Sequence, residues 1–143
     1  MRCITGFLLA AILLVSCQNN DKKAAAAAGS PRDSSQLTTV QWLDSARDFG
    51  KIQEGQRLEV AFRFRNTGNK PLVIEKVQPS CGCTVAEQPK EPIQPGGEGQ
   101  IKASFNSEGR VGTNHKTLFV YANMKDAPTH SLEFVVQVEK KPS

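Results

Sequence analysis

The sequence predicts an all-β domain over residues 36–143, an immunoglobulin-like antiparallel β-sandwich of about seven strands. Apolar and polar residues alternate through most of this region. Clusters of Gly, Pro, Asn and Asp separate the alternating runs, and no apolar stripe of helical period and useful length occurs. Many short strands between frequent turn signals are typical of a sandwich.

The longest alternating run spans residues 58–64 and ends at the turn residues 66–69. The same pattern predicts strands over residues 72–77, 101–105, 118–122 and 132–138, and shorter strands near 40–43 and around Val85. The cysteine pair that joins the two sheets of antibody domains is absent. We therefore expect the core to depend on four phenylalanines, namely Phe62, Phe64, Phe105 and Phe134.

Residues 1–16 are predicted to be a lipoprotein signal peptide. A basic Met1-Arg2 start precedes an apolar run over residues 4–15, which is shorter than the roughly 20 residues that span a bilayer. Residues 14–17, Leu-Val-Ser-Cys, are similar to a bacterial lipobox, and this similarity implies cleavage before Cys17 and lipid on its sulfur. The alternative is an ordinary secretory signal followed by a chance cysteine.

Residues 17–35 are predicted to be the lipidated cysteine and a flexible tether. They combine polar residues with five consecutive alanines, and a helix this short is marginal in water. Two or more acyl chains make attachment to a membrane stable. We therefore expect a protein anchored by lipid outside the cytoplasm, on the periplasmic face or at the outer membrane of the cell envelope.

The composition argues against several classes of function. Removal of residues 1–16 leaves 17 basic and 14 acidic residues, a net charge of +3, which gives no indication of nucleic-acid binding. The sequence contains no Gly-x-Ser-x-Gly, phosphate-loop or His-Glu-x-x-His motif. Arg57, Arg63 and Arg65 share one strand face, which is either a solvated charged face or a surface for an acidic partner.

Cys81 and Cys83 are the two cysteines that remain after the signal peptide and the lipid site are set aside. In an extended strand they would lie on one face, at the upper limit of Cα separation for a disulfide, unless Gly82 tightens the turn. Three interpretations stay open: a local bridge, a dithiol that exchanges with partner thiols, and a metal site completed by His115 and His130. The spacing of these histidines does not match a zinc finger, and both are expected to be exposed, His115 in a loop and His130 in a turn.

Several local patterns occur in a fixed order along the domain. They are Asp48-Phe49-Gly50-Lys51-Ile52, the run Phe62–Gly68 that ends in Asn-Thr-Gly, Pro71–Ile74, Ser80-Cys81-Gly82-Cys83-Thr84, and Pro95-Gly96-Gly97. Together they resemble the bacterial family catalogued as domain of unknown function 1573, over roughly residues 48–138. The resemblance implies an immunoglobulin-like sandwich related to the ASH and major-sperm-protein modules.

These observations favour a binding or assembly module over an enzyme. We expect its partners to be the membrane, through the N-terminal lipid, and one or more proteins of the cell envelope, and we expect no cofactor. Edge pairing with another protein is a binding mode that such a sandwich offers. The alternative is a thiol-redox or metal-handling protein that acts through Cys81 and Cys83.

Overall fold

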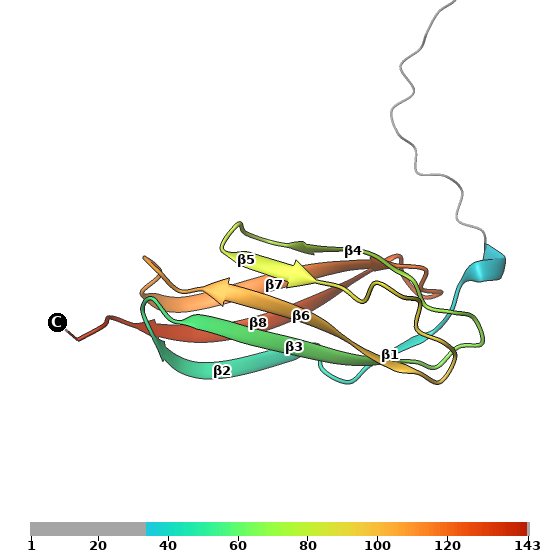
Figure 1. Cartoon of the computed structure of the whole chain (residues 1–143), viewed down its shortest axis with the longest axis horizontal. Helices are drawn as coiled ribbons and strands as arrows, with labels where there is room; N and C mark the ends of the chain where they lie inside the picture. Colours follow the sequence, from blue (N-terminus) through green and yellow to red (C-terminus); the bar gives the residue numbers. More distant parts are fainter. Residues whose placement is uncertain (1–33, 143) are drawn as a thin grey trace, which may run out of the picture. The chain divides into compact units, whose positions relative to one another are not determined.

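The computed structural model describes residues 34–142, so the predicted signal peptide, the predicted lipid site at Cys17 and most of the predicted tether lie outside it. No helix in this range is long and apolar enough to span a bilayer. A short 3-10 helix η1 (Ser34–Gln36) precedes the strands (Figure 1). The strands are β1 (Val40–Trp42), β2 (Ala46–Gln53), β3 (Arg57–Asn66), β4 (Ile74–Pro79), β5 (Thr84–Glu87), β6 (Glu98–Asn106), β7 (Gly112–Ala122) and β8 (Thr129–Glu139).

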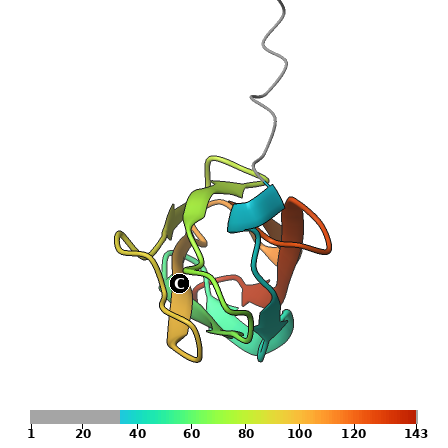
Figure 2. The same cartoon turned by 90° about the vertical axis from the view of Figure 1, so that its right-hand side faces the viewer.

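The strands form two four-stranded sheets, which confirms the all-β, immunoglobulin-like sandwich. The first sheet has the order β1-β3-β6-β5, and the second has the order β2-β8-β7-β4. Viewed end-on, the strands surround a common interior (Figure 2). Pairing is antiparallel except between β2 and β8, which run parallel. The second sheet is therefore mixed, which corrects the prediction of a wholly antiparallel sandwich.

All seven predicted strands are present in the structure, and β2 is the strand that the alternation pattern missed. In β2, Phe49 and Ile52 are partly buried against the core although they are three residues apart. The register shifts between Asp48 and Lys51, and Gly50 adopts a φ of +66°, so the strand carries a bulge. This bulge breaks the period-2 pattern, because it rotates the second half of the strand relative to the first.

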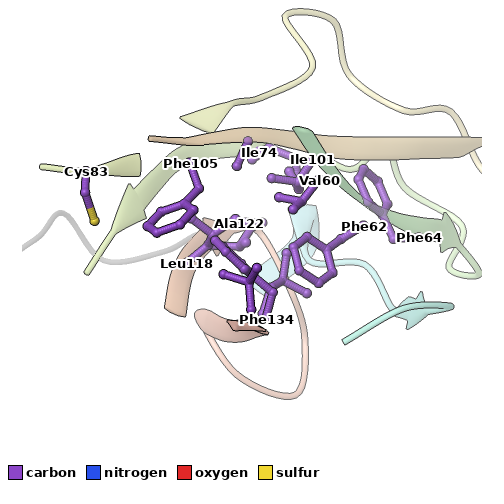
Figure 3. Packing of buried hydrophobic residues seen from close by; sticks show 14 of the residues in the cluster. Val60, Phe62, Phe64, Ile74, Cys83, Ile101, Phe105, Leu118, Ala122 and Phe134 are labelled. Carbon is purple, nitrogen blue, oxygen red and sulfur yellow. The ribbon is translucent and has the colours of Figure 1, made fainter. Parts of the chain in front are cut away.

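The core lies between the sheets, as the alternation predicted. The four phenylalanines Phe62, Phe64, Phe105 and Phe134 are at most 1% exposed (Figure 3). Phe105 and Phe134 come from opposite sheets and meet edge-on with their ring centroids 6.0 Å apart. Aliphatic residues of β6, β7 and β8 fill the remaining interior, namely Ile101, Leu118, Val120, Leu132, Val136 and Val138.

The Asn-Thr-Gly turn after β3 is held by one fully buried side chain. The amide nitrogen of Asn66 donates to the carbonyl oxygens of Lys70 and Ile93, at 2.7 and 2.9 Å. Its amide oxygen accepts hydrogen bonds from the Thr38 hydroxyl at 2.8 Å and from the Gly68 N–H at 3.1 Å. Both ends of the amide are thus satisfied, and Asn66 joins the start of β1 to two loops.

Candidate functional site

The Cys-Gly-Cys segment connects the two sheets, since it follows β4 of the second sheet and precedes β5 of the first. Ser80 N–H donates to the Thr117 carbonyl of β7 at 2.9 Å, and Thr117 N–H donates to the Ser80 hydroxyl at 3.2 Å. On the other side, Asn106 N–H of β6 donates to the Cys83 carbonyl at 3.0 Å. The segment is therefore tied to a strand of each sheet by contacts that do not involve sulfur.

Cys81 and Cys83 form a disulfide in this structure, with their Cα atoms 5.3 Å apart. This separation is shorter than an extended strand would give, because the segment forms a turn in which Thr84 N–H donates to the Cys81 carbonyl at 3.4 Å. Gly82 is not among the glycines with positive φ. The tightening thus comes from the turn and not from a left-handed glycine, which corrects the geometric expectation.

The two sulfurs have different surroundings. Cys83 is 8% exposed and belongs to the buried core, at the end of the interior where Phe105 lies (Figure 3). Cys81 is only partly buried. The Thr84 side chain is 5% exposed, and its hydroxyl oxygen lies 3.7 Å from Cys81 Sγ and 3.9 Å from Cys83 Sγ. A buried hydroxyl group therefore faces both sulfur atoms.

Lys116 of β7 is a cationic residue beside the strand position that binds this turn. It precedes Thr117, the partner of Ser80, and its Nζ lies 5.6 Å from the ring centroid of Phe105. Phe105 is in turn the cross-strand partner of Thr84. Burial lowers the pKa of the Lys116 ammonium, and the nearby Arg110 charge lowers it further.

The two histidines do not join the cysteines. His115 lies on β7 and not in a loop, with its side chain exposed as expected. His130 lies on β8 and not in an exposed turn: it is half-buried, stacks on Trp42, and places Nε2 3.3 Å from the Ser45 hydroxyl. Burial lowers the pKa of His130. Their register positions on the paired strands β7 and β8 are five residues apart, roughly 17 Å.

Within residues 34–142, no group of three or more His, Cys, Asp and Glu side chains is placed to hold a metal ion. The disulfide uses both sulfurs, and the histidines lie on different strands. The arrangement does not assemble the Cys₂His₂ set that the residue count alone allows.

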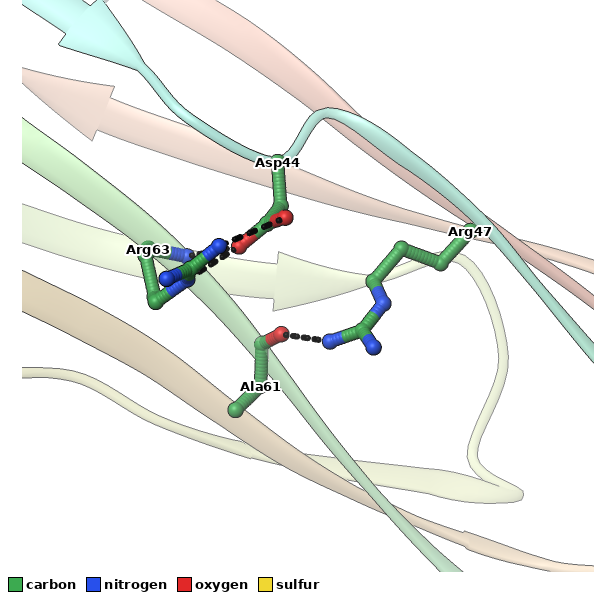
Figure 4. Close-up of polar contacts among 4 residues, drawn as sticks. All are labelled: Asp44, Arg47, Ala61 and Arg63. Carbon is green, nitrogen blue, oxygen red and sulfur yellow. Dashed lines mark hydrogen bonds and ion pairs between the residues drawn. The ribbon is translucent and has the colours of Figure 1, made fainter.

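The arginine-bearing face of β3 is matched by acidic neighbours. Arg63 Nε donates to Asp44 Oδ2 at 2.8 Å, and Arg63 N–H donates to the same carboxylate oxygen at 3.2 Å (Figure 4). The hydrogen bond from the Arg63 side chain holds the pKa of Asp44 below its usual value. Arg65 pairs in the same way with Glu98 at 2.5 Å. This pairing weakens the case for a surface that binds an acidic partner.

Three of the four lateral edges of the sandwich are protected. Along β3, where β1 ends, Arg47 of β2 donates to the Ala61 carbonyl at 3.1 Å, beside the Asp44–Arg63 pair (Figure 4). The β2 edge carries the bulge at Gly50. The β4 edge carries another irregularity and ends in a proline, and Gln88 donates to its Ile74 carbonyl at 3.1 Å. Bulges, prolines and capping side chains prevent strand addition.

The β5 edge has none of these features. Its four residues pair with β6 in continuous register, and no other strand of the described chain forms ladder hydrogen bonds with it. Val85 in this strand is 61% exposed. Because β5 pairs only with residues 102–105, the first part of β6 is also open on this side. Two hollows that share Glu87 and Lys102 follow this edge, and they are lined by Glu59, Val85, Gln88, Pro89, Ile93, Gly99, Gln100, Ala103 and Ser104.

Sequence reasoning had named Cys81 and Cys83 but missed Thr84, Lys116 and the β5 edge. Thr84 follows the motif directly, and only the fold shows that its hydroxyl faces both sulfurs. Lys116 lies two residues before the buried Leu118 on β7, so the alternation pattern alone would place it on the inward face of the strand. The open edge depends on strand order, which local sequence does not encode.

Solved structures with this fold come from several contexts. A protein of unknown function from Porphyromonas gingivalis W83 superposes with a TM-score of 0.64 at 19% identity, over 73% of this chain and 49% of that one. The ASH/PapD-like domain 7 of human CEP192 superposes with a TM-score of 0.57 at 13% identity, over 83% of this chain and 98% of that one. The chaperone YadV gives 0.52 at 15% identity, over 71% and 53%.

These identities establish the fold alone. The chain spans about half the length of the Porphyromonas gingivalis protein. A search of curated proteins found no match. A family model does match residues 40–138, more than half of the chain, and it covers the strands, the Asn66 turn and the Cys-Gly-Cys segment described above. The chain therefore belongs to the family described as protein of unknown function (DUF1573).

Proposed function

We propose that this protein is a binding module of the cell envelope that takes up an extended segment of a partner protein along the free edge of β5. The observation that carries the proposal is the contrast between the β5 edge and the three protected edges. An exposed strand edge offers main-chain hydrogen bonds to an added strand, and pockets beside it select the partner's side chains.

The hollows beside β5 indicate which segment would fit. Val85 offers an exposed apolar contact, and Glu59 and Glu87 place two carboxylates around a hollow that has one ammonium, that of Lys102. An extended segment with an apolar residue next to a basic one complements this lining. The fold is also that of YadV and of SfaE, a periplasmic chaperone that superposes with a TM-score of 0.50 at 13% identity, over 73% of this chain and 60% of that one.

Photo-crosslinking in cells tests the edge. A photoreactive amino acid at Glu87 is expected to give a discrete protein adduct, whereas the same amino acid at Lys51 on the bulged β2 edge is not. Val85→Lys should abolish the adduct, since a charge at this position opposes strand addition. Val111→Lys changes another exposed valine and serves as the control that retains the adduct. Equal adducts at both edges, or an adduct that survives Val85→Lys, would refute β5 as the docking edge.

The envelope location rests on the predicted lipid at Cys17. An oxidising compartment is also where a structural disulfide persists, in keeping with the Cys81–Cys83 bridge. Mass spectrometry of the mature N-terminal peptide is expected to find Cys17 as the first residue with acyl chains attached. Cys17→Ser should move the protein from the membrane fraction to the soluble fraction. An unmodified N-terminus would refute the anchor and leave the β5 proposal to its own test.

A further inference from the structure

The Cys81–Cys83 bridge is not required to hold its own segment in place. The Ser80 N–H bond to Thr117 and the Asn106 N–H bond to Cys83 already tie the turn to β7 and β6. The bridge closes a loop with a sequence separation of 2, and a loop this short removes little entropy from the unfolded chain. The bridge can therefore open without unfolding of the sandwich, and in this respect it differs from a structural disulfide.

The two sulfurs differ in exposure, and this difference indicates which of them an incoming thiolate attacks. Thiol–disulfide exchange begins when a thiolate attacks one sulfur and the other sulfur departs. Cys81 is partly exposed, whereas Cys83 is part of the core. An incoming thiolate can therefore reach Cys81 from solvent, with Cys83 pointing inward as the leaving group.

The Thr84 hydroxyl distinguishes the two redox states. Disulfide sulfur is a weak hydrogen-bond acceptor, and in the oxidised state the partners that residues 34–142 give this buried hydroxyl are the two sulfurs, at 3.7 and 3.9 Å. A thiolate is a far stronger acceptor, because hydrogen bonds to charged groups exceed neutral ones. Thr84 is thus better satisfied when the bridge is open, and this difference favours reduction.

Lys116 adds positive charge on the same side of the core. Its ammonium lies over Phe105, whose cross-strand partner is Thr84. Among residues 34–142, no carboxylate lies within ion-pairing distance of Lys116. Burial and Arg110 lower its pKa, so an anion formed nearby would stabilise its charged form.

We propose that Cys81–Cys83 is a thiol–disulfide exchange site for dithiol-containing proteins, in which Cys81 is the sulfur attacked, Cys83 is the leaving group and Thr84 is a positioning residue. The partner's thiolate attacks Cys81 Sγ, the bond between Cys81 and Cys83 breaks, and its electron pair goes to Cys83 Sγ. The partner's second thiolate then attacks its own sulfur in the mixed disulfide and releases Cys81. The partner dithiol is oxidised to a disulfide and loses two protons: one ends on Cys81 and the other passes to solvent, so that Cys83 remains the thiolate beside Thr84.

Glutathione is a suitable probe, applied to the full protein purified in detergent. Trypsin releases residues 77–90 as one peptide that contains both cysteines and excludes Cys17, so alkylation and mass spectrometry read the bridge directly. We expect reduced glutathione to open the bridge while circular dichroism shows that the sandwich stays folded. A bridge that opens only when the sandwich unfolds would overturn the proposal.

Single variants test the assignment of the sulfurs. In the folded state, Cys83→Ser should react with glutathione disulfide to form a mixed disulfide at Cys81, with release of reduced glutathione, about tenfold faster than Cys81→Ser does at Cys83, because of the difference in exposure. Equal rates would overturn the assignment. If either variant fails to fold, wild-type protein decides the question by a brief reaction with glutathione disulfide after reduction, since the first mixed disulfide should form on Cys81 and not on Cys83.

The thiol–disulfide equilibrium of the bridge in Thr84 variants tests the role of Thr84, because a purely structural role would leave this equilibrium unchanged. Thr84→Val should shift the equilibrium of the bridge with glutathione toward the disulfide by about tenfold, because the reduced state loses a hydrogen bond to a charged acceptor. Thr84→Ser should restore the wild-type equilibrium, and Thr129→Val, at the first residue of β8, should leave it unchanged. An unchanged equilibrium in Thr84→Val would overturn the role of Thr84.

Discussion

Trp42 of β1 and His130 of β8 stack face to face, with ring centroids 4.3 Å apart and planes 5° apart. The two residues belong to opposite sheets, and Trp42 also packs on Phe64 at 5.4 Å. Because β1 contributes only three residues to its sheet, this stack fastens the strand to the other half of the sandwich.

Replacement of Trp42 by alanine is expected to lower the free energy of unfolding by about 3 kcal/mol, since it removes a large aromatic side chain packed on two rings. Trp42→Phe keeps an aromatic ring and should cost less than half as much. Urea unfolding measures both values. A loss below about 1 kcal/mol in Trp42→Ala would mean that the other contacts of β1 suffice to hold it.

The burial of His130 predicts a dependence of stability on pH. Its pKa is lower in the folded protein than the ordinary value of about 6.5, so the unfolded chain binds the proton more tightly. The folded state should therefore lose stability as the pH falls below about 6.5, down to the folded pKa. Urea unfolding between about pH 7.5 and pH 5 should show a smaller loss in His130→Gln than in wild type. His115→Gln, which changes the exposed histidine, should keep the wild-type slope.

The hydrogen bonds of the buried Asn66 amide predict that replacing this amide by a carboxylate strongly destabilises the fold. Asn66→Asp removes two donors and places a carboxylate against the carbonyl oxygens of Lys70 and Ile93. We expect a loss of about 3 kcal/mol in the free energy of unfolding. Asn69→Asp, in the same turn but exposed, is the matched control and should change stability by less than about 0.5 kcal/mol. Equal effects in thermal or urea unfolding would contradict the hydrogen-bond assignment.

Gly68 and Gly82, which belong to two of the patterns that resemble the family, should respond differently to replacement by alanine. A Cβ on Gly68 would lie 2.1 Å from the Thr38 hydroxyl and 2.6 Å from the backbone nitrogen of Thr39, so the loops must move apart. Gly68→Ala is expected to cost about 2 kcal/mol. A Cβ on Gly82 meets nothing within 4 Å, and Gly82→Ala should leave stability within about 0.5 kcal/mol of wild type. Differential scanning calorimetry of the two variants compares them directly.

Removal of the bridge should cost less stability than removal of one core ring. The double variant Cys81→Ala/Cys83→Ala is expected to lose about 1.5 kcal/mol, because the closed loop is so short. Phe105→Ala, at the adjacent end of the core, should lose about 3–5 kcal/mol. A loss in the double variant as large as that of Phe105→Ala would identify the bridge as a structural staple.

The alternation pattern was sufficient for the strands that face the core on one side and solvent on the other. Phe62, Phe105 and Phe134 illustrate this, since each alternates with outward residues and each is buried. It failed for β2, where the bulge at Gly50 changes the period within the strand, and it could not indicate that β2 runs parallel to β8. Strand direction is set by the path of the whole chain and not by local pattern.

The site was predicted less completely than the fold, for a related reason. His130 has the same parity as Leu132 and Phe134, so an extension of the β8 pattern by one step would have placed it on the inward face. The proline nearby suggested a turn instead. The stack with Trp42, the hydroxyl of Thr84 and the charge of Lys116 are contacts between segments far apart in the sequence, and only the three-dimensional fold brings them together.

The positions of the chain ends within the described sandwich have a mechanical consequence. η1 and β1 lie at one end of the strands, and β8 finishes at the opposite end (Figure 1). A pulling force between Thr38 and Glu139 would therefore act along the strands, whereas the hydrogen bonds between strands run across them. β8, with β2 on one side and β7 on the other, would have to slide past both neighbours at once. A force between the two ends of the domain would therefore load the inter-strand hydrogen bonds of β8 in shear, and this geometry favours high resistance to mechanical unfolding.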